Sequence, residues 1–128
     1  MKGFGKQNTS KTKKVSNKKT KLPKEEIINK AFKFHSQGNI SEAAKYYQYF
    51  INQGFKHHKA FLNYGIILKD LGKLKESEIY TRKAIEIKPD YAEAHYNLGN
   101  LLSNFGKLQE SEVLYRKTIE LDPHYMKA

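Results

Sequence analysis

The sequence contains neither cysteine nor tryptophan. Without cysteine, the chain has no disulfide, no thiolate metal site and no cysteine nucleophile. No apolar run approaches the roughly 20 residues of a membrane-spanning helix. The basic N-terminus also lacks the apolar segment of a secretory signal. We therefore expect a cytoplasmic protein.

Acidic side chains are missing from residues 1–22, which hold eight of the lysines. The rest of the chain carries 16 basic and 13 acidic residues, so most of the net charge of +11 belongs to this segment. A polar stretch without apolar periodicity buries too little surface to fold. We predict a disordered lysine-rich tail over 1–22. It is either a solubilising extension or a salt-sensitive contact with nucleic acid or an anionic membrane.

After this tail the sequence repeats with a period of 34. Residues 58–91 and 92–125 are identical at 16 of 34 positions without a gap, and 24–57 matches 92–125 at six positions. Each unit has two amphipathic patterns joined by a short turn that contains glycine, which indicates a repeat architecture of helix pairs. The patterns predict helices over 24–36, 41–53, 58–70, 74–87, 92–104 and 108–121.

A 34-residue helix–turn–helix unit of this kind resembles the tetratricopeptide repeat. The family's small residue of the first helix corresponds to Ala31, Gly65 and Gly99. Its small residue of the second helix corresponds to Ala43, Ser77 and Ser111. Its aromatic position in the second helix corresponds to Tyr47, Thr81 and Tyr115. Pro89 and Pro123 match the closing proline, whereas Phe55 takes its place in the first unit. The tryptophan position holds Ile27, Phe61 and His95, which are all departures.

The resemblance implies an all-α fold, a right-handed α-solenoid of three repeats. The units would be a divergent repeat at 23–57, repeats at 58–91 and 92–125, and the start of a missing fourth repeat at 126–128. Gly65 and Gly99 lie inside predicted helices, where each costs about 1 kcal/mol relative to alanine. We expect them to let the second helix of each unit approach closely, opposite Ser77 and Ser111.

Asn29, Asn63 and Asn97 share the sixth position of their units. The resemblance implies that first helices line a concave groove and that this position faces into it. An asparagine amide both accepts and donates, so a file of them can hold the main chain of an extended peptide. A similar asparagine ladder occurs in the helical arm of O-linked N-acetylglucosamine transferase, whose units resemble 92-AEAHYNLGNLL-102. The alternative is a tolerated polar residue on a solvated face.

Other candidate groove residues follow from the same helix face. They are Phe32, Lys59, Ile66, Tyr96 and Asn100, with Ile28 and Leu62 beside them. The carboxylate clamp of chaperone-binding relatives is absent, because Ile28, Phe32, Glu93 and Asn97 stand where that clamp has its lysines and asparagines. We therefore do not expect recognition of an acidic C-terminus.

No catalytic constellation, phosphate loop or metal box is evident, so we expect neither an enzyme nor a cofactor. His57 and His58 lack a third metal ligand, and adjacent helical residues point in different directions. We interpret them as a solvated pair at a helix start, and His95 as a half-buried packing residue.

The predicted function is a protein-interaction scaffold that binds an extended peptide in the groove. The alternatives are an electrostatic adaptor that uses the tail, or the truncated non-catalytic arm of a repeat-containing transferase. The second helix of the third unit has an apolar face without a cover, formed by Val113, Leu114, Tyr115, Ile119 and Leu121. The chain is then a shortened member of a longer family, or a partner or a second copy covers this face.

Overall fold

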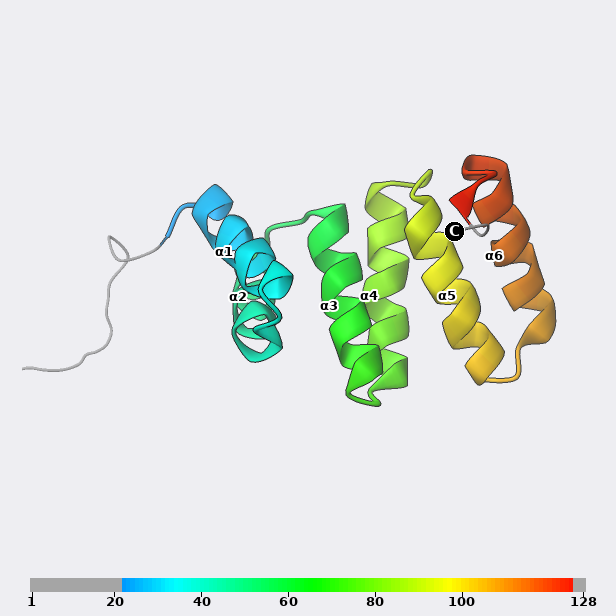
Figure 1. Ribbon diagram of the computed structural model, residues 1–128, viewed down its shortest axis with the longest axis horizontal. Helices are drawn as coiled ribbons and strands as arrows, with labels where there is room; N and C mark the ends of the chain where they lie inside the picture. Colours follow the sequence, from blue (N-terminus) through cyan, green and yellow to red (C-terminus); the bar gives the residue numbers. More distant parts are fainter. Residues whose placement is uncertain (1–21, 126–128) are drawn as a thin grey trace, which may run out of the picture.

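The structure is a computed structural model that describes residues 22–125. This part of the chain folds into six α-helices and contains no strand (Figure 1). The helices are α1 (Lys24–Ser36), α2 (Ile40–Asn52), α3 (His58–Asp70), α4 (Leu74–Ile87), α5 (Ala92–Asn104) and α6 (Leu108–Leu121). Five match the predicted ranges. The second begins and ends one residue earlier than predicted, because the Asn39 side chain caps it by accepting a hydrogen bond from the Glu42 amide.

The turn inside each helix pair contains a glycine with left-handed backbone geometry. Gly38, Gly72 and Gly106 have φ values of 78°, 83° and 79°. Glycine adopts this conformation without the steric cost that a side chain imposes. These turns reverse the chain so that the two helices of a pair run side by side.

The six helices form a right-handed α-solenoid in which each helix packs against the next along the chain (Figure 1). We call the helix pairs α1–α2, α3–α4 and α5–α6 unit 1, unit 2 and unit 3. The packing within each unit is more extensive than the packing at the joints α2–α3 and α4–α5. The joints α2–α3 and α4–α5 are therefore the less extensive contacts of the solenoid.

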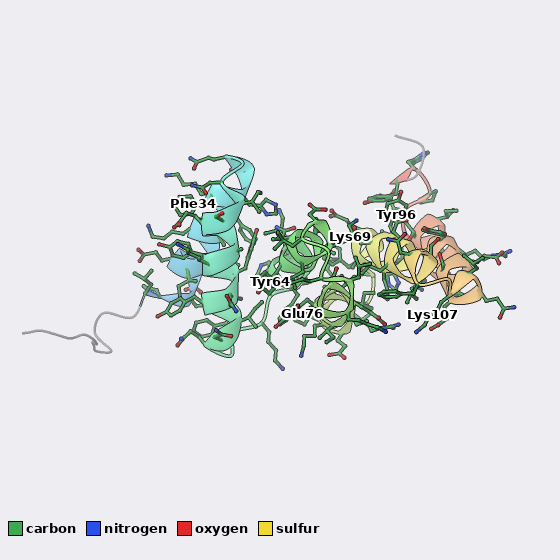
Figure 2. The ribbon with its side chains drawn as sticks, turned by 90° about the horizontal axis from the view of Figure 1, so that it is seen from below. Phe34, Tyr64, Lys69, Glu76, Tyr96 and Lys107 are labelled. Atoms are coloured by element: carbon green, nitrogen blue, oxygen red, sulfur yellow. The ribbon has the colours of Figure 1, made fainter. Side chains whose placement is uncertain are left out.

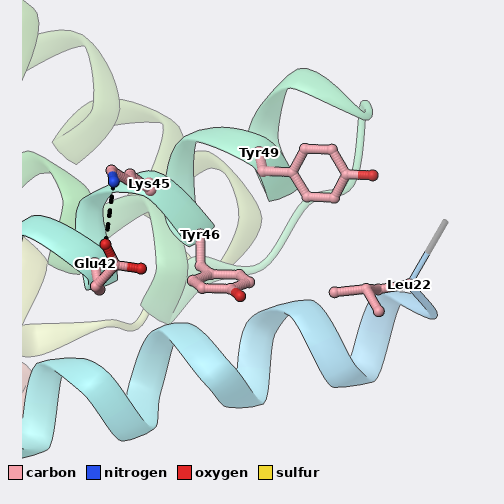
Figure 3. A pocket seen from close by; sticks show the side chains of 5 residues that line it. All are labelled: Leu22, Glu42, Lys45, Tyr46 and Tyr49. Carbon is pink, nitrogen blue, oxygen red and sulfur yellow. Dashed lines mark hydrogen bonds and ion pairs between the residues drawn. The ribbon is translucent and has the colours of Figure 1, made fainter. Parts of the chain in front are cut away.

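Unit 1 closes the N-terminal end of the solenoid with aromatic side chains. Tyr47 and Phe50 are fully buried, as expected for a core cluster. Tyr46 and Tyr49 lie at the surface of this core and line a hollow beside the ion pair of Glu42 and Lys45 (Figure 3).

Leu22 is the one residue of the predicted tail that lies within the described part of the chain. Leu22 is half-buried and packs against the core of unit 1, because its apolar side chain continues the aromatic surface of α2 (Figure 3). The rest of the predicted tail, residues 1–21, and the predicted start of a fourth repeat at 126–128 lie outside the described residues.

The two helical glycines mark the closest approach of the helices in units 2 and 3. A Cβ atom on Gly65 would lie 2.9 Å from Thr81 Oγ1, and one on Gly99 would lie 2.8 Å from Tyr115 Cε1. The Ser77 hydroxyl donates to the Gly65 carbonyl at 2.6 Å, and the Ser111 hydroxyl donates to the Gly99 carbonyl at 2.8 Å. The structure confirms the predicted glycine–serine contacts.

The outer face of α6 is more exposed than the equivalent face of α4, because α5 packs against α4. The Arg82–Glu78 pair on α4 has side-chain exposures of 46% and 15%, whereas the corresponding Arg116–Glu112 pair on α6 has 77% and 62%. Val113 and Ile119 are exposed as predicted, but Leu114, Tyr115 and Leu121 are half-buried. Within residues 22–125, no helix is both long and apolar enough to cross a membrane.

Candidate functional site

Asn63 is a structural part of the joint between units 1 and 2. Its Nδ2 donates to the Tyr47 hydroxyl at 2.9 Å, and His35 Nδ1 lies 2.9 Å from the same oxygen. The Tyr47 hydroxyl has one donor and two acceptor sites, so it bonds the amide and the ring at once, and the tautomer of His35 decides whether the hydroxyl or the ring donates. The three side chains form a chain of hydrogen bonds from α3 through α2 to α1.

The pKa shifts of Tyr47 and His35 favour the uncharged form of both side chains. Burial raises the pKa of Tyr47 to about 12, against the opposite effect of the Asn63 hydrogen bond, so the phenol keeps its proton. Burial also lowers the pKa of His35 below its ordinary value. Both shifts favour the uncharged side chains, so the joint carries no charge at Tyr47 or His35.

Asn97, one period later, has a different partner. Its Nδ2 donates to the Glu93 carbonyl in the preceding turn of α5, at 2.9 Å. The position that holds Tyr47 in unit 1 holds Thr81 in unit 2, and its hydroxyl donates to the Ser77 carbonyl at 2.8 Å. Within the described residues no bond engages Asn97 Oδ1, and the residue is half-buried, so the amide retains hydrogen-bonding capacity.

Asn29 lies in more polar surroundings than the other two asparagines. It is exposed and lines a shallow depression of α1 together with charged residues. These neighbours are Glu25, Glu26, Lys30 and Lys33. The sequence period therefore places three asparagines at one position of the repeat, but the structure gives them three different environments.

Asn100 and Tyr96 lie on α5 beside the aromatic residues of unit 3. The Tyr115 hydroxyl donates to Asn100 Oδ1, which leaves the Nδ2 group of Asn100 as a donor. The Tyr96 ring, which Figure 2 labels on the C-terminal part of the solenoid, packs against Tyr115 and Tyr125 with centroid distances of 5.8 and 5.3 Å. With Asn97, these residues give α5 a half-exposed surface of amide groups and an aromatic ring.

Phe32 and Lys59 bring α1 and α3 together at the other end of the candidate site. The Lys59 ammonium lies 5.3 Å from the centroid of the Phe32 ring, within the range of a cation–π contact. Ile66 is half-buried, as a residue at the edge of the site should be. Ile28 and Leu62 were wrongly expected on this face: both are buried, because they point into the contacts between helices.

The histidine pair at the start of α3 is packed rather than solvated, which corrects the prediction. The rings of His57 and His58 stack with a centroid distance of 4.8 Å. His57 also meets the edge of Phe32, and His58 meets Tyr91. Both histidines are half-buried.

His95 is buried rather than half-buried, at 8% exposure. Its Nε2 donates to the Pro89 carbonyl at 2.8 Å, and its buried Nδ1 has no partner among the described residues. This contact belongs to the joint between units 2 and 3. The ring fills a family tryptophan position and serves packing.

The structure identifies two residues that sequence reasoning missed as part of the site. Tyr47 and His35 decide how Asn63 is held, yet neither was a candidate. The only signal in the sequence is the residue at the aromatic position of the second helix. It is Tyr47 in the unit before Asn63 and Thr81 in the unit before Asn97.

Models of the tetratricopeptide repeat match residues 58–91 and 92–125, which together exceed half of the chain. The chain belongs to the tetratricopeptide repeat family. None of the curated protein sequences is similar enough to count as a relative. Residues 23–57, which form a helix pair of the same kind, remain a predicted divergent repeat.

Solved structures of tetratricopeptide proteins share the fold. A crystal structure of MamA aligns with a TM-score of 0.73 at 19% identity and covers 81% of this chain, which spans 61% of the MamA chain. The first repeat domain of Spaghetti (RPAP3), solved with the HSP90 peptide SRMEEVD, has a TM-score of 0.71 at 21% identity and covers 81% of this chain and 82% of its own. The second such domain, with the same peptide, has a TM-score of 0.70 at 20% identity, covering 78% of this chain and 87% of its own.

Proposed function

We propose that this chain is a non-catalytic scaffold that binds an extended peptide segment along the first helices of its units. The groove residues are Phe32, Lys59, Asn63, Ile66, Tyr96, Asn97 and Asn100, with Asn29 at the N-terminal end. The observation that carries the proposal is the state of Asn97 and Asn100. Both are half-buried amides with hydrogen-bonding groups that no described residue engages.

The groups that remain free suit a peptide main chain. Asn97 Oδ1 accepts from a main-chain N–H, and Asn100 Nδ2 donates to a main-chain carbonyl. Tyr96 adds an aromatic surface for a side chain of the peptide. The related fold of the Spaghetti (RPAP3) domains holds a peptide in the solved complexes, which supports this class of ligand.

The residues at the groove argue against an acidic C-terminal peptide. Ile28 is buried and Glu93 adds negative charge to α5. We therefore expect the peptide SRMEEVD to bind weakly, and internal extended segments to bind better. This separates the proposed ligand from the one in the Spaghetti (RPAP3) complexes.

The test starts with selection of binders to the full chain from a library of random peptides. The affinity of a selected peptide is then measured for the wild type, for Asn97→Ala and for the matched control Asn52→Ala at the exposed end of α2. We expect a loss of about 2- to 10-fold for Asn97→Ala, the worth of one hydrogen bond. Asn52→Ala should leave the affinity unchanged.

Main-chain recognition is tested in the peptide itself. Replacing one amide of the selected peptide by an ester removes a donor and keeps the side chains. At the residue that meets Asn97, this change should weaken binding to the wild type but not to Asn97→Ala. Equal losses for both proteins, or no difference between Asn97→Ala and Asn52→Ala, would contradict the proposed contact of Asn97 with the peptide main chain.

A further inference from the structure

The histidine pair at the start of α3 contacts unit 1 on one side and the turn between units 2 and 3 on the other. The His57 ring lies edge-on to Phe32 of α1 at a centroid distance of 5.7 Å. The His58 ring stacks on His57 at 4.8 Å and meets Tyr91, in the turn before α5, at 5.0 Å. A change in the charge of these two rings therefore acts where unit 1 joins the rest of the solenoid.

His57 also forms the N-terminal cap of α3. Its Nδ1 accepts a hydrogen bond from the Lys59 amide at 3.1 Å. An imidazole accepts at one nitrogen only while it is neutral, because both nitrogens of the charged ring are donors. The cap is thus compatible with the neutral ring alone.

We propose that the His57–His58 pair makes the α2–α3 joint acid-sensitive. Protonation removes the cap of α3 and places charge on stacked rings, which separates the pair from Phe32. Unit 1 then moves relative to unit 2, and the groove changes shape between Phe32 and Lys59.

The charged groups around the pair act mostly in one direction. Lys24 of α1 and Lys59 of α3 face His57, and Lys88 after α4 faces His58. Asp90 alone opposes them, and it is paired with Lys88 at 3.2 Å. Burial first, and then the His58 ring and the ammonium groups of Lys24 and Lys59, lower the pKa of His57. Burial first, and then the ammonium groups of Lys88 and Lys59, lower the pKa of His58.

The direction of the pH effect follows from these shifts. Below the ordinary histidine pKa of about 6.5 the unfolded chain binds protons that the closed joint does not. The contribution of the pair to stability is therefore complete above that pH. It is lost as the pH falls toward the lowered pKa values.

The test measures distances across each joint in the full chain, which has no cysteine of its own. Spin labels at Gln48→Cys and Lys83→Cys span the α2–α3 joint, and labels at Lys83→Cys and Val113→Cys span the α4–α5 joint. On going from about pH 7.5 to about pH 5, on either side of the histidine pKa, the first distance distribution should broaden. The second should stay the same.

Two variants assign this response to the pair. His57→Asn with His58→Gln keeps a capping side chain that does not titrate, and the acid-induced broadening should be lost. The matched control His124→Gln, at an exposed residue beyond α6, should retain it. An unchanged first distance in acid, or broadening that persists in full in the double variant, would overturn the proposal.

A measurement on the wild type guards against a variant that fails to fold. Proton NMR of the imidazole rings follows the titration of each histidine directly. His57 and His58 should titrate below the ordinary histidine pKa of about 6.5. Titration of both rings at or above that pH would also overturn the proposal.

Discussion

The joints α2–α3 and α4–α5 occupy equivalent places in the solenoid but differ in chemistry. At α2–α3, the Tyr47 hydroxyl of the preceding unit reaches Asn63 and fixes it. At α4–α5, the equivalent residue is Thr81, whose shorter side chain bonds to its own helix, while Asn97 bonds to the Glu93 carbonyl. One residue in the second helix of a unit thus decides whether the asparagine of the next unit supports the joint or remains available.

Because of this difference, we expect the α2–α3 joint to contribute mainly to stability and the exposed groups of α5 to contribute mainly to binding. The α2–α3 joint contains a half-buried chain of hydrogen bonds that passes through the buried Tyr47 hydroxyl. The α4–α5 joint relies on packing and on the contact of His95 with the Pro89 carbonyl. We therefore expect changes near unit 1 to affect folding first, and changes on α5 to affect binding first.

The largest effect should come from removing the hydroxyl at the α2–α3 joint. Tyr47→Phe leaves both His35 Nδ1 and Asn63 Nδ2 without their partner in a buried region. We expect a decrease in the free energy of unfolding of about 1–3 kcal/mol, measured by urea denaturation. Tyr115→Phe, which removes one hydroxyl at a half-buried tyrosine, should cost less. Equal costs would mean that the chain through Tyr47 adds nothing to the joint.

A smaller effect is expected when a methyl group is added at the two helical glycines. Alanine gains about 1 kcal/mol of helix propensity at either position. At Gly65 the new Cβ meets Thr81 Oγ1 and, at 3.3 Å, the Ser77 carbonyl, neither of which moves easily. At Gly99 it meets the edge of the half-buried Tyr115 ring, a side chain that shifts at less cost than the backbone of Ser77.

Gly65→Ala should therefore lower the free energy of unfolding by up to about 2 kcal/mol, since overpacking costs about 1–3 kcal/mol. Gly99→Ala should be close to neutral. Thermal denaturation of the two variants in parallel compares them. The reverse order would show that residue 81 does not set the space between α3 and α4.

The smallest effect is expected when the α4–α5 joint is given a tyrosine at the position that Tyr47 occupies at the α2–α3 joint. Thr81→Tyr places a phenol opposite Gly65, as Tyr115 lies opposite Gly99, and brings a hydroxyl toward Asn97. A double-mutant cycle with Asn97→Ala should give a coupling free energy of about 0.5–1.5 kcal/mol. A coupling free energy of zero would mean that the position of the tyrosine is not sufficient to fix the asparagine.

The sequence predicts most of the fold because the period, the glycine turns and the closing prolines are local signals. The close contacts at Gly65 and Gly99 could be inferred for the same reason, since a small residue recurs opposite each glycine. The burial of Ile28 and Leu62 was not predicted, because the helix face alone does not tell a groove from a helix–helix contact.

The unequal roles of Asn29, Asn63 and Asn97 were also beyond the sequence. A shared repeat position implies a shared face, but hydrogen-bond partners depend on which side chain of the neighbouring unit reaches that face. The histidine pair shows the same limit: its stacking depends on Phe32 and Tyr91, which lie far from it in the sequence and come close only in the folded chain.

The most direct measurement follows the side-chain amide signals of Asn63, Asn97 and Asn100 by NMR while a selected peptide is added to the full chain. We predict that the Asn97 and Asn100 signals shift with the peptide, whereas the Nδ2 signal of Asn63, bonded to Tyr47, changes little. A shift at Asn63 that equals the shift at Asn97, or no shift at Asn97 at saturation, would contradict the division between a structural joint and a binding surface.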